Sequence, residues 1–66
     1  MATRFGMRLK RLRTKQGLSL RNLEKKVGVS YAYLSMLERG VKANPSLDLV
    51  KKLARALKVT VGDLVA

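Results

Sequence analysis

A chain of 66 residues is long enough for one small domain, and we expect residues 1–66 to form it. The absence of cysteine and histidine excludes a disulfide framework and the commonest zinc ligands, so no metal or cofactor site is expected. Fifteen Lys and Arg against four acidic residues give a formal net charge of +11, which predicts an anionic partner. The candidates are nucleic acid, an acidic protein and an anionic membrane.

The composition also disfavours an enzyme. Without His, Cys or paired carboxylates, the Ser, Lys and Tyr side chains have no activating partner, so we predict no catalytic residue and no small-molecule substrate. No apolar run approaches the ~18–20 residues that cross a bilayer. The basic segment 1–13 also lacks the apolar core of a secretory signal. We therefore expect a cytoplasmic protein that does not bind membranes.

Glycines and one proline divide the chain into five predicted helices. The first covers about 3–16 and ends near Gly17. Its apolar residues recur at i, i+4 and i+7, as expected of a helix that packs one face on a core: Phe5, Leu9 and Leu12. Its opposite face is basic and carries Arg4, Arg8, Arg11 and Lys15.

Two short helices follow, at about 20–27 and 31–39, and end at Gly28 and Gly40. Both have serine at the predicted N-cap, Ser19 and Ser30. Two short helices joined by a turn with glycine are typical of the helix-turn-helix motif, although many small helical bundles share this feature. An apolar set spans the pair: Leu23, Val27, Val29, Leu34 and Leu37.

The fourth helix is predicted at about 47–57, after a loop that contains Pro45. Its apolar residues repeat at helical spacing: Leu47, Val50, Leu53, Ala54 and Leu57. The last helix begins after Thr60, with Asp63 placed to complete a capping box. No segment alternates with period two, so we predict an all-α fold.

The order of these segments resembles the phage-repressor (Cro/C1-type, or XRE) helix-turn-helix family, from Phe5 to Val65. The most specific matches are Arg13 with Gly17-Leu18-Ser19, Gly28-Val29-Ser30, Glu38-Arg39-Gly40, Asn44-Pro45-Ser46-Leu47, Leu53-Ala54 and Ala56-Leu57. The resemblance implies a compact five-helix bundle of the lambda-repressor-like type. It also implies a transcriptional regulator, repressor more than activator, that binds a palindromic double-stranded DNA operator as a homodimer.

The resemblance assigns roles to individual residues. Base edges would be met by Ser30, Tyr31, Ala32 and Met36. The DNA backbone would be met by Arg21, Tyr33, Ser35, Arg39, Lys42 and Asn44, with Lys10 or Lys15 as further candidates. A structural ion pair between Arg13 and Glu38 would fix the helix at 31–39 against the first helix.

Positions 30–38 contain no Arg, Lys, Asn or Gln, the side chains that make bidentate contacts to bases. We therefore expect specificity to depend on van der Waals contact, water bridges and DNA shape. Tyr31 is expected to be exposed. For Tyr33 and Met36, packing against a neighbouring helix is an equal alternative to DNA contact.

Two positions, Leu20 and Glu24, differ from the family pattern, and the role of a third, Leu49, is not given by it. Leu20 replaces a glutamine, whose contact is either absent or taken by Arg21 or Asn22. Glu24 replaces a small residue, so either the two helices lie further apart or Glu24 bends outward to a cation. Leu49 is predicted to be exposed, at an interface with Val65 or as an isolated surface leucine. The competing function is a protein-interaction module of the antitoxin or multi-protein regulator type.

Overall fold

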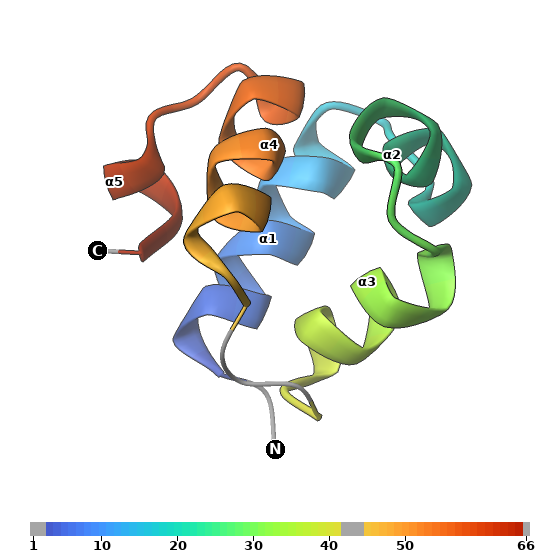
Figure 1. Cartoon of the computed structure of the whole chain (residues 1–66), viewed down its shortest axis with the longest axis horizontal. Helices are drawn as coiled ribbons and strands as arrows, with labels where there is room; N and C mark the ends of the chain where they lie inside the picture. The colour runs from blue at the N-terminus through green and yellow to red at the C-terminus, as the bar shows by residue number, and fades with distance from the viewer. Residues whose placement is uncertain (1–2, 42–44, 66) are drawn as a thin grey trace.

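The computed structural model describes residues 3–41 and 45–65, and these ranges contain five helices and no strand (Figure 1). The predicted all-α, five-helix fold is confirmed. The helices are α1 (Arg4–Lys15), α2 (Leu20–Val27), α3 (Tyr31–Arg39), α4 (Leu47–Leu57) and α5 (Val61–Val65).

The five helices pack as a closed ring. The order of contacts runs from α1 to α3, α2, α4 and α5, and α5 returns to α1. Every helix contributes at least one fully buried leucine to the centre: Leu9, Leu23, Leu34, Leu37, Leu53, Leu57 and Leu64. Each such leucine contributes about 1.5–3 kcal/mol by leaving water. The shared core therefore holds α3 between α1 and α2.

Helix α4 buries four residues of the predicted apolar stripe, Val50, Leu53, Ala54 and Leu57, but Leu49 takes the place of Leu47 in it. Leu49 is only 8% exposed, whereas Leu47 is 62% exposed. The Ser46 hydroxyl caps α4 by accepting the Leu49 N–H at 3.2 Å, which makes Leu47 the first helical residue, outside the buried stripe. The prediction that Leu49 is exposed is therefore wrong.

Gly6 lies where α1 passes closest to the end of α3. A Cβ at this position would lie 2.7 Å from the carbonyl oxygen of Glu38 and closer still to that of Leu37. Both are backbone atoms, which cannot rotate away as a side chain can. The apolar pattern of the sequence does not reveal this contact, although an isolated glycine inside a helix often marks one.

We predict that Gly6→Ala lowers the free energy of unfolding by about 1–3 kcal/mol, because the backbone of α1 or α3 must shift to admit a methyl group. This cost outweighs the ~1 kcal/mol by which alanine favours a helix over glycine. Gly62→Ala is the matched control, because its Cβ would meet only the Thr60 hydroxyl at 3.6 Å. Urea unfolding followed by circular dichroism measures both changes. A similar gain of stability in both variants would contradict the close contact of α1 and α3.

Helix α5 begins with a reciprocal pair of hydrogen bonds. The Thr60 N–H donates to Asp63 Oδ2 at 2.9 Å, and the Asp63 N–H donates to Thr60 Oγ1 at 3.1 Å. The predicted capping box is thus confirmed. The Thr60 N–H, followed by the Thr60 hydroxyl and the charge of Arg8, lowers the pKa of the Asp63 carboxyl below 3.8.

This shift predicts the direction of a pH effect on stability. A carboxyl whose pKa is lower in the folded state stabilises the fold fully above its unfolded pKa, and the contribution is lost as pH falls through the folded pKa. The melting temperature of Asp63→Asn should therefore vary less with pH in the acid range than that of the parent chain. A ¹³C NMR titration of the Asp63 carboxyl gives the folded pKa directly. A value at or above 3.8 would contradict the capping role.

Candidate nucleic-acid interface

Three residues, 28–30, connect α2 to α3. Gly28 ends α2 at a φ of 74°, and its N–H donates to the Glu24 carbonyl at 2.8 Å. Glycine adopts this left-handed conformation without the steric cost that a Cβ would bring. The Ser30 hydroxyl then begins α3 by accepting the Tyr33 N–H at 3.2 Å. The helix-turn-helix predicted from the sequence is therefore present, with both helix ends satisfied by local hydrogen bonds.

Helix α3 has one buried face and one exposed end. Leu34, Leu37 and Glu38 are buried, and the predicted base-contacting residues Ser30, Tyr31 and Ala32 are exposed at the start of the helix. Of the other α3 positions that were predicted to meet DNA, Tyr33, Ser35 and Met36 are half-buried and Arg39 is exposed at the end of the helix. Tyr33 also packs against the core. The surface that α3 offers a partner therefore centres on its first turn.

The backbone and the ring of Tyr31 are both held by α2. Glu24 Oε2 accepts the Tyr31 N–H at 3.2 Å, and Arg21 Cζ lies over the Tyr31 ring at 4.5 Å from its centroid. Glu24 was expected either to separate the helices or to bend outward to a cation. Instead it joins them, and its negative charge is favourable at the N-terminus of α3. Tyr31 is 42% exposed, yet its contacts with Glu24 and Arg21 define its position.

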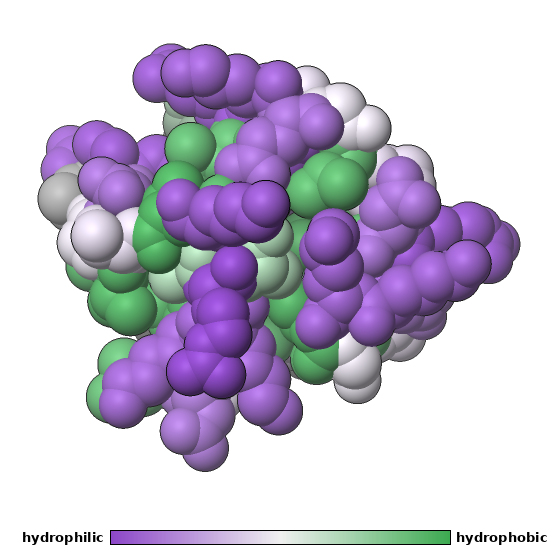
Figure 2. All heavy atoms as spheres, turned by 90° about the horizontal axis from the view of Figure 1, so that it is seen from above, coloured by the Kyte–Doolittle hydropathy of each residue, from purple (hydrophilic) through white to green (hydrophobic). Residues whose placement is uncertain are grey.

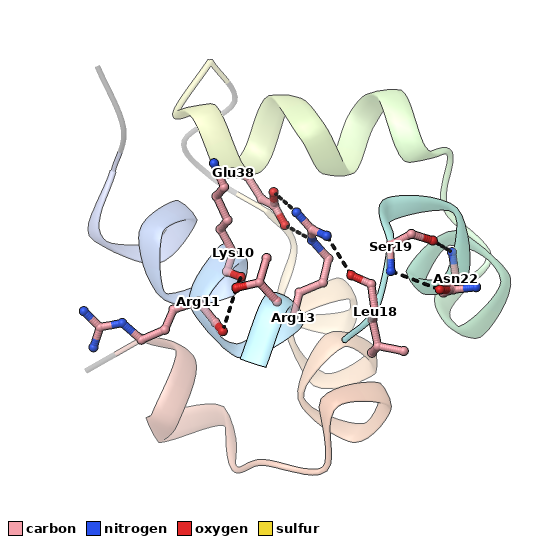
Figure 3. Close-up of polar contacts among 8 residues, drawn as sticks. Lys10, Arg11, Arg13, Leu18, Ser19, Asn22 and Glu38 are labelled. Atoms are coloured by element: carbon pink, nitrogen blue, oxygen red, sulfur yellow. Dashed lines mark hydrogen bonds and ion pairs between the residues drawn. The ribbon is translucent and has the colours of Figure 1, made fainter. Parts of the chain in front are cut away.

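The N-terminus of α2 is capped by a capping box. The Ser19 hydroxyl accepts the Asn22 N–H, and Asn22 Oδ1 accepts the Ser19 N–H, both at 3.0 Å (Figure 3). Leu20 packs against the core. Asn22 Oδ1 is thus used in the cap of α2.

Arg13 and Glu38 form the ion pair that the resemblance implied. Arg13 Nε donates to Glu38 Oε2 at 2.6 Å and Nη2 donates to Oε1 at 3.0 Å (Figure 3). The third arm, Nη1, donates to the Leu18 carbonyl at 2.7 Å. The two side chains are only 11% and 5% exposed. This buried, bidentate contact fixes the end of α3 to α1, and so fixes how α3 projects from the body of the domain.

The basic residues are distributed over more than one face. Arg21 and Arg39 are exposed on α2 and α3, whereas Lys42 and Asn44 lie outside the described residues. Figure 2 shows one face of the molecule, on which long hydrophilic side chains extend around and over apolar ones. A separate shallow hollow on α1 is lined by Arg4, Met7, Arg8 and Arg11. Part of the net charge therefore lies away from α3.

Within the ranges 3–41 and 45–65, no group of acidic or other ligand side chains is arranged to hold a metal ion. The described helices are also too short and too polar for any of them to cross a membrane.

Comparison with known proteins identifies the family of this chain. The family model described as helix-turn-helix matches residues 9–64. The transcriptional regulator SinR of Bacillus subtilis is 40% identical over 60 residues, which cover 91% of this chain and 54% of SinR. The regulator DdrOP3 of Deinococcus deserti is 44% identical over 57 residues, which cover 86% of this chain and 43% of DdrOP3. The chain thus spans about half the length of these relatives.

Solved structures agree with the sequence matches. The crystal structure of SinR in complex with DNA has a TM-score of 0.90 and 39% identity, and the match covers 94% of this chain and 98% of that one. The restriction-modification controller protein C.AhdI from Aeromonas hydrophila has a TM-score of 0.87 and 41% identity, over 92% of this chain and 91% of that one. The chain belongs to the Cro/C1-type helix-turn-helix family.

Proposed function

We propose that this chain is the DNA-binding domain of a transcriptional regulator and that it places the first turn of α3 in the major groove of double-stranded DNA. One observation carries the proposal: the exposed start of α3 is held to α2 through Tyr31, while its far end is fixed to α1 by the Arg13–Glu38 pair. A groove-reading helix needs such a fixed projection from its scaffold. The similarity to SinR, whose structure was solved in complex with DNA, supports DNA as the partner.

The finer features of the function are part of the same proposal. Ser30, Tyr31, Ala32 and Met36 face base edges, and Arg39 with Lys42 and Asn44 meets phosphates beyond the C-terminus of α3. The protein acts as a repressor in the cytoplasm, on the nucleoid, and it has no catalytic activity. Two copies bind a palindromic operator, because a two-fold protein matches a two-fold site.

Selection of bound duplexes from a random pool tests the proposal. We expect an enriched sequence with two-fold symmetry, whose half-sites are separated by a helical turn or a multiple of it. If a monomer neutralises about four phosphates, the logarithm of the binding constant should fall with the logarithm of salt concentration at a slope of about −3.6. A pool that stays random, together with no duplex binding at low salt, would overturn the proposal and favour the protein-interaction module.

A further inference from the structure

The exposed first turn of α3 has no side chain that could make a bidentate contact to a base. Positions 30–38 contain no Arg, Lys, Asn or Gln. The nearest fork-shaped side chain belongs to α2, where Arg21 Cζ lies 4.5 Å from the centre of the Tyr31 ring. Tyr31 is the first residue of α3. The Arg21 guanidinium is therefore positioned at the end of the helix that is proposed to enter the groove.

Three local contacts define the position of Tyr31, on whose ring Arg21 lies. The Tyr31 N–H is bound by Glu24, the Ser30 hydroxyl caps the first turn of α3, and Gly28 fixes the preceding turn. Glu24 lies three residues after Arg21, so the two side chains emerge on neighbouring parts of the α2 surface. The carboxylate also occupies the Tyr31 N–H, which leaves one fewer amide for a phosphate at this helix end. The start of α3 is thus arranged for contacts by side chains.

A guanidinium stacked on an aromatic ring uses its flat face and keeps its N–H groups, which lie in its plane, for other partners. Among the described residues, no hydrogen bond or ion pair involves the Arg21 side chain. Bidentate donation by arginine to guanine O6 and N7 is the commonest specific contact in the major groove. The contact with the ring restricts the conformations of the Arg21 side chain, and this reduces the entropy lost when the contact with guanine forms.

We propose that Arg21, held by Tyr31, reads a guanine in the major groove and supplies the bidentate contact that the first turn of α3 lacks. This inference rests on the proposed function and revises the expectation that Arg21 meets only the DNA backbone. Arg21 and Tyr31 act as one unit: the ring orients the fork, and the fork reads the base. A contact with phosphate would need only the positive charge of Arg21, whereas a contact with guanine needs its planar fork.

The test is a random-pool selection with the parent chain and with Arg21→Lys, which keeps the charge but loses the planar fork. We expect the parent to enrich one invariant guanine per half-site and Arg21→Lys to lose about tenfold or more of its preference for that guanine. Binding of unrelated duplexes should change by less than about twofold, because the charge is kept. Tyr31→Leu should lose the same guanine preference, and Tyr31→Phe, which keeps the ring, should retain it.

Lys26→Ala is the control for charge, because it removes one exposed basic side chain from the same helix. This variant should bind the cognate and the unrelated duplexes more weakly by the same factor, and it should retain the preference for guanine. If Arg21→Lys enriches the same guanine as the parent, Arg21 does not read that base and this inference is overturned, while the proposed function stands. If the parent itself enriches no sequence, the proposed function fails. Circular dichroism melts of each variant establish that the compared proteins are folded.

Discussion

Replacing Glu38 by alanine should lower the free energy of unfolding by about 3–5 kcal/mol, because it leaves the Arg13 guanidinium charged, buried and without its carboxylate. Arg13 is only 11% exposed in its side chain, so water cannot readily replace the lost partner. A 66-residue domain has a total stability of about 3–10 kcal/mol. Glu38→Ala should therefore be largely unfolded well below the melting temperature of the parent.

The double variant Arg13→Met/Glu38→Leu should lose less stability than Glu38→Ala alone. Removing both charges together leaves no buried ion without a partner, and apolar residues of similar size can fill the space. A residual loss of about 1–3 kcal/mol is expected, because the Leu18 carbonyl loses the hydrogen bond from Arg13 Nη1. Urea unfolding of the parent, Arg13→Met, Glu38→Leu and the double variant gives the coupling energy. If the loss of unfolding free energy in the double variant equals the sum of the losses in the single variants, the pair does not act as a buried unit.

Replacing Tyr31 by alanine should weaken binding to the selected operator by about 10–100-fold and leave binding to unrelated duplexes within about twofold. The exposed ring contributes to base recognition and orients Arg21, but it carries no charge for phosphates. Fluorescence anisotropy with the two duplexes measures both constants. Tyr31 is exposed and makes no contribution to the buried core, so the variant should fold.

Tyr33→Ala is the contrasting variant for this measurement. Tyr33 is half-buried and packs against the core, so its loss should lower stability as well as affinity. For Tyr31→Ala, in contrast, the affinity for unrelated duplexes should hardly change. If its affinities for the operator and for unrelated duplexes fall by the same factor, Tyr31 lies outside the groove.

The helix boundaries could be predicted from the sequence because they depend on local chemistry. Ser19, Ser30 and Ser46 accept the backbone N–H of the residue three positions on, and Gly28 and Gly40 end their helices at positive φ. Such capping involves neighbours along the chain, so the residue types alone indicate it. The Arg13–Glu38 pair spans 25 residues and was implied only by the family resemblance.

The contacts that the sequence did not reveal depend on how separate helices meet. Helical spacing cannot decide between Leu47 and Leu49, because both lie at the margin of the apolar stripe of α4. The packing of α4 against α2 and α5 decides which of them is buried. The close approach at Gly6 depends on the distance between α1 and α3. The joining of α2 to Tyr31 by Glu24 and Arg21 depends on the geometry of the turn. All three depend on tertiary packing, and only the glycine at position 6 leaves a local sign of it.

The central claim is that the first turn of α3, oriented by α2, enters the DNA groove. The most direct test is to follow the backbone amides of the chain by ¹⁵N NMR while a duplex enriched by the chain is added. We predict that the largest shift changes fall at the start of α2, in the turn at 28–30 and over residues 31–36, with small changes on the α1 surface that carries Arg4, Arg8 and Arg11. Largest changes on that α1 surface, with α3 unaffected, would contradict the account.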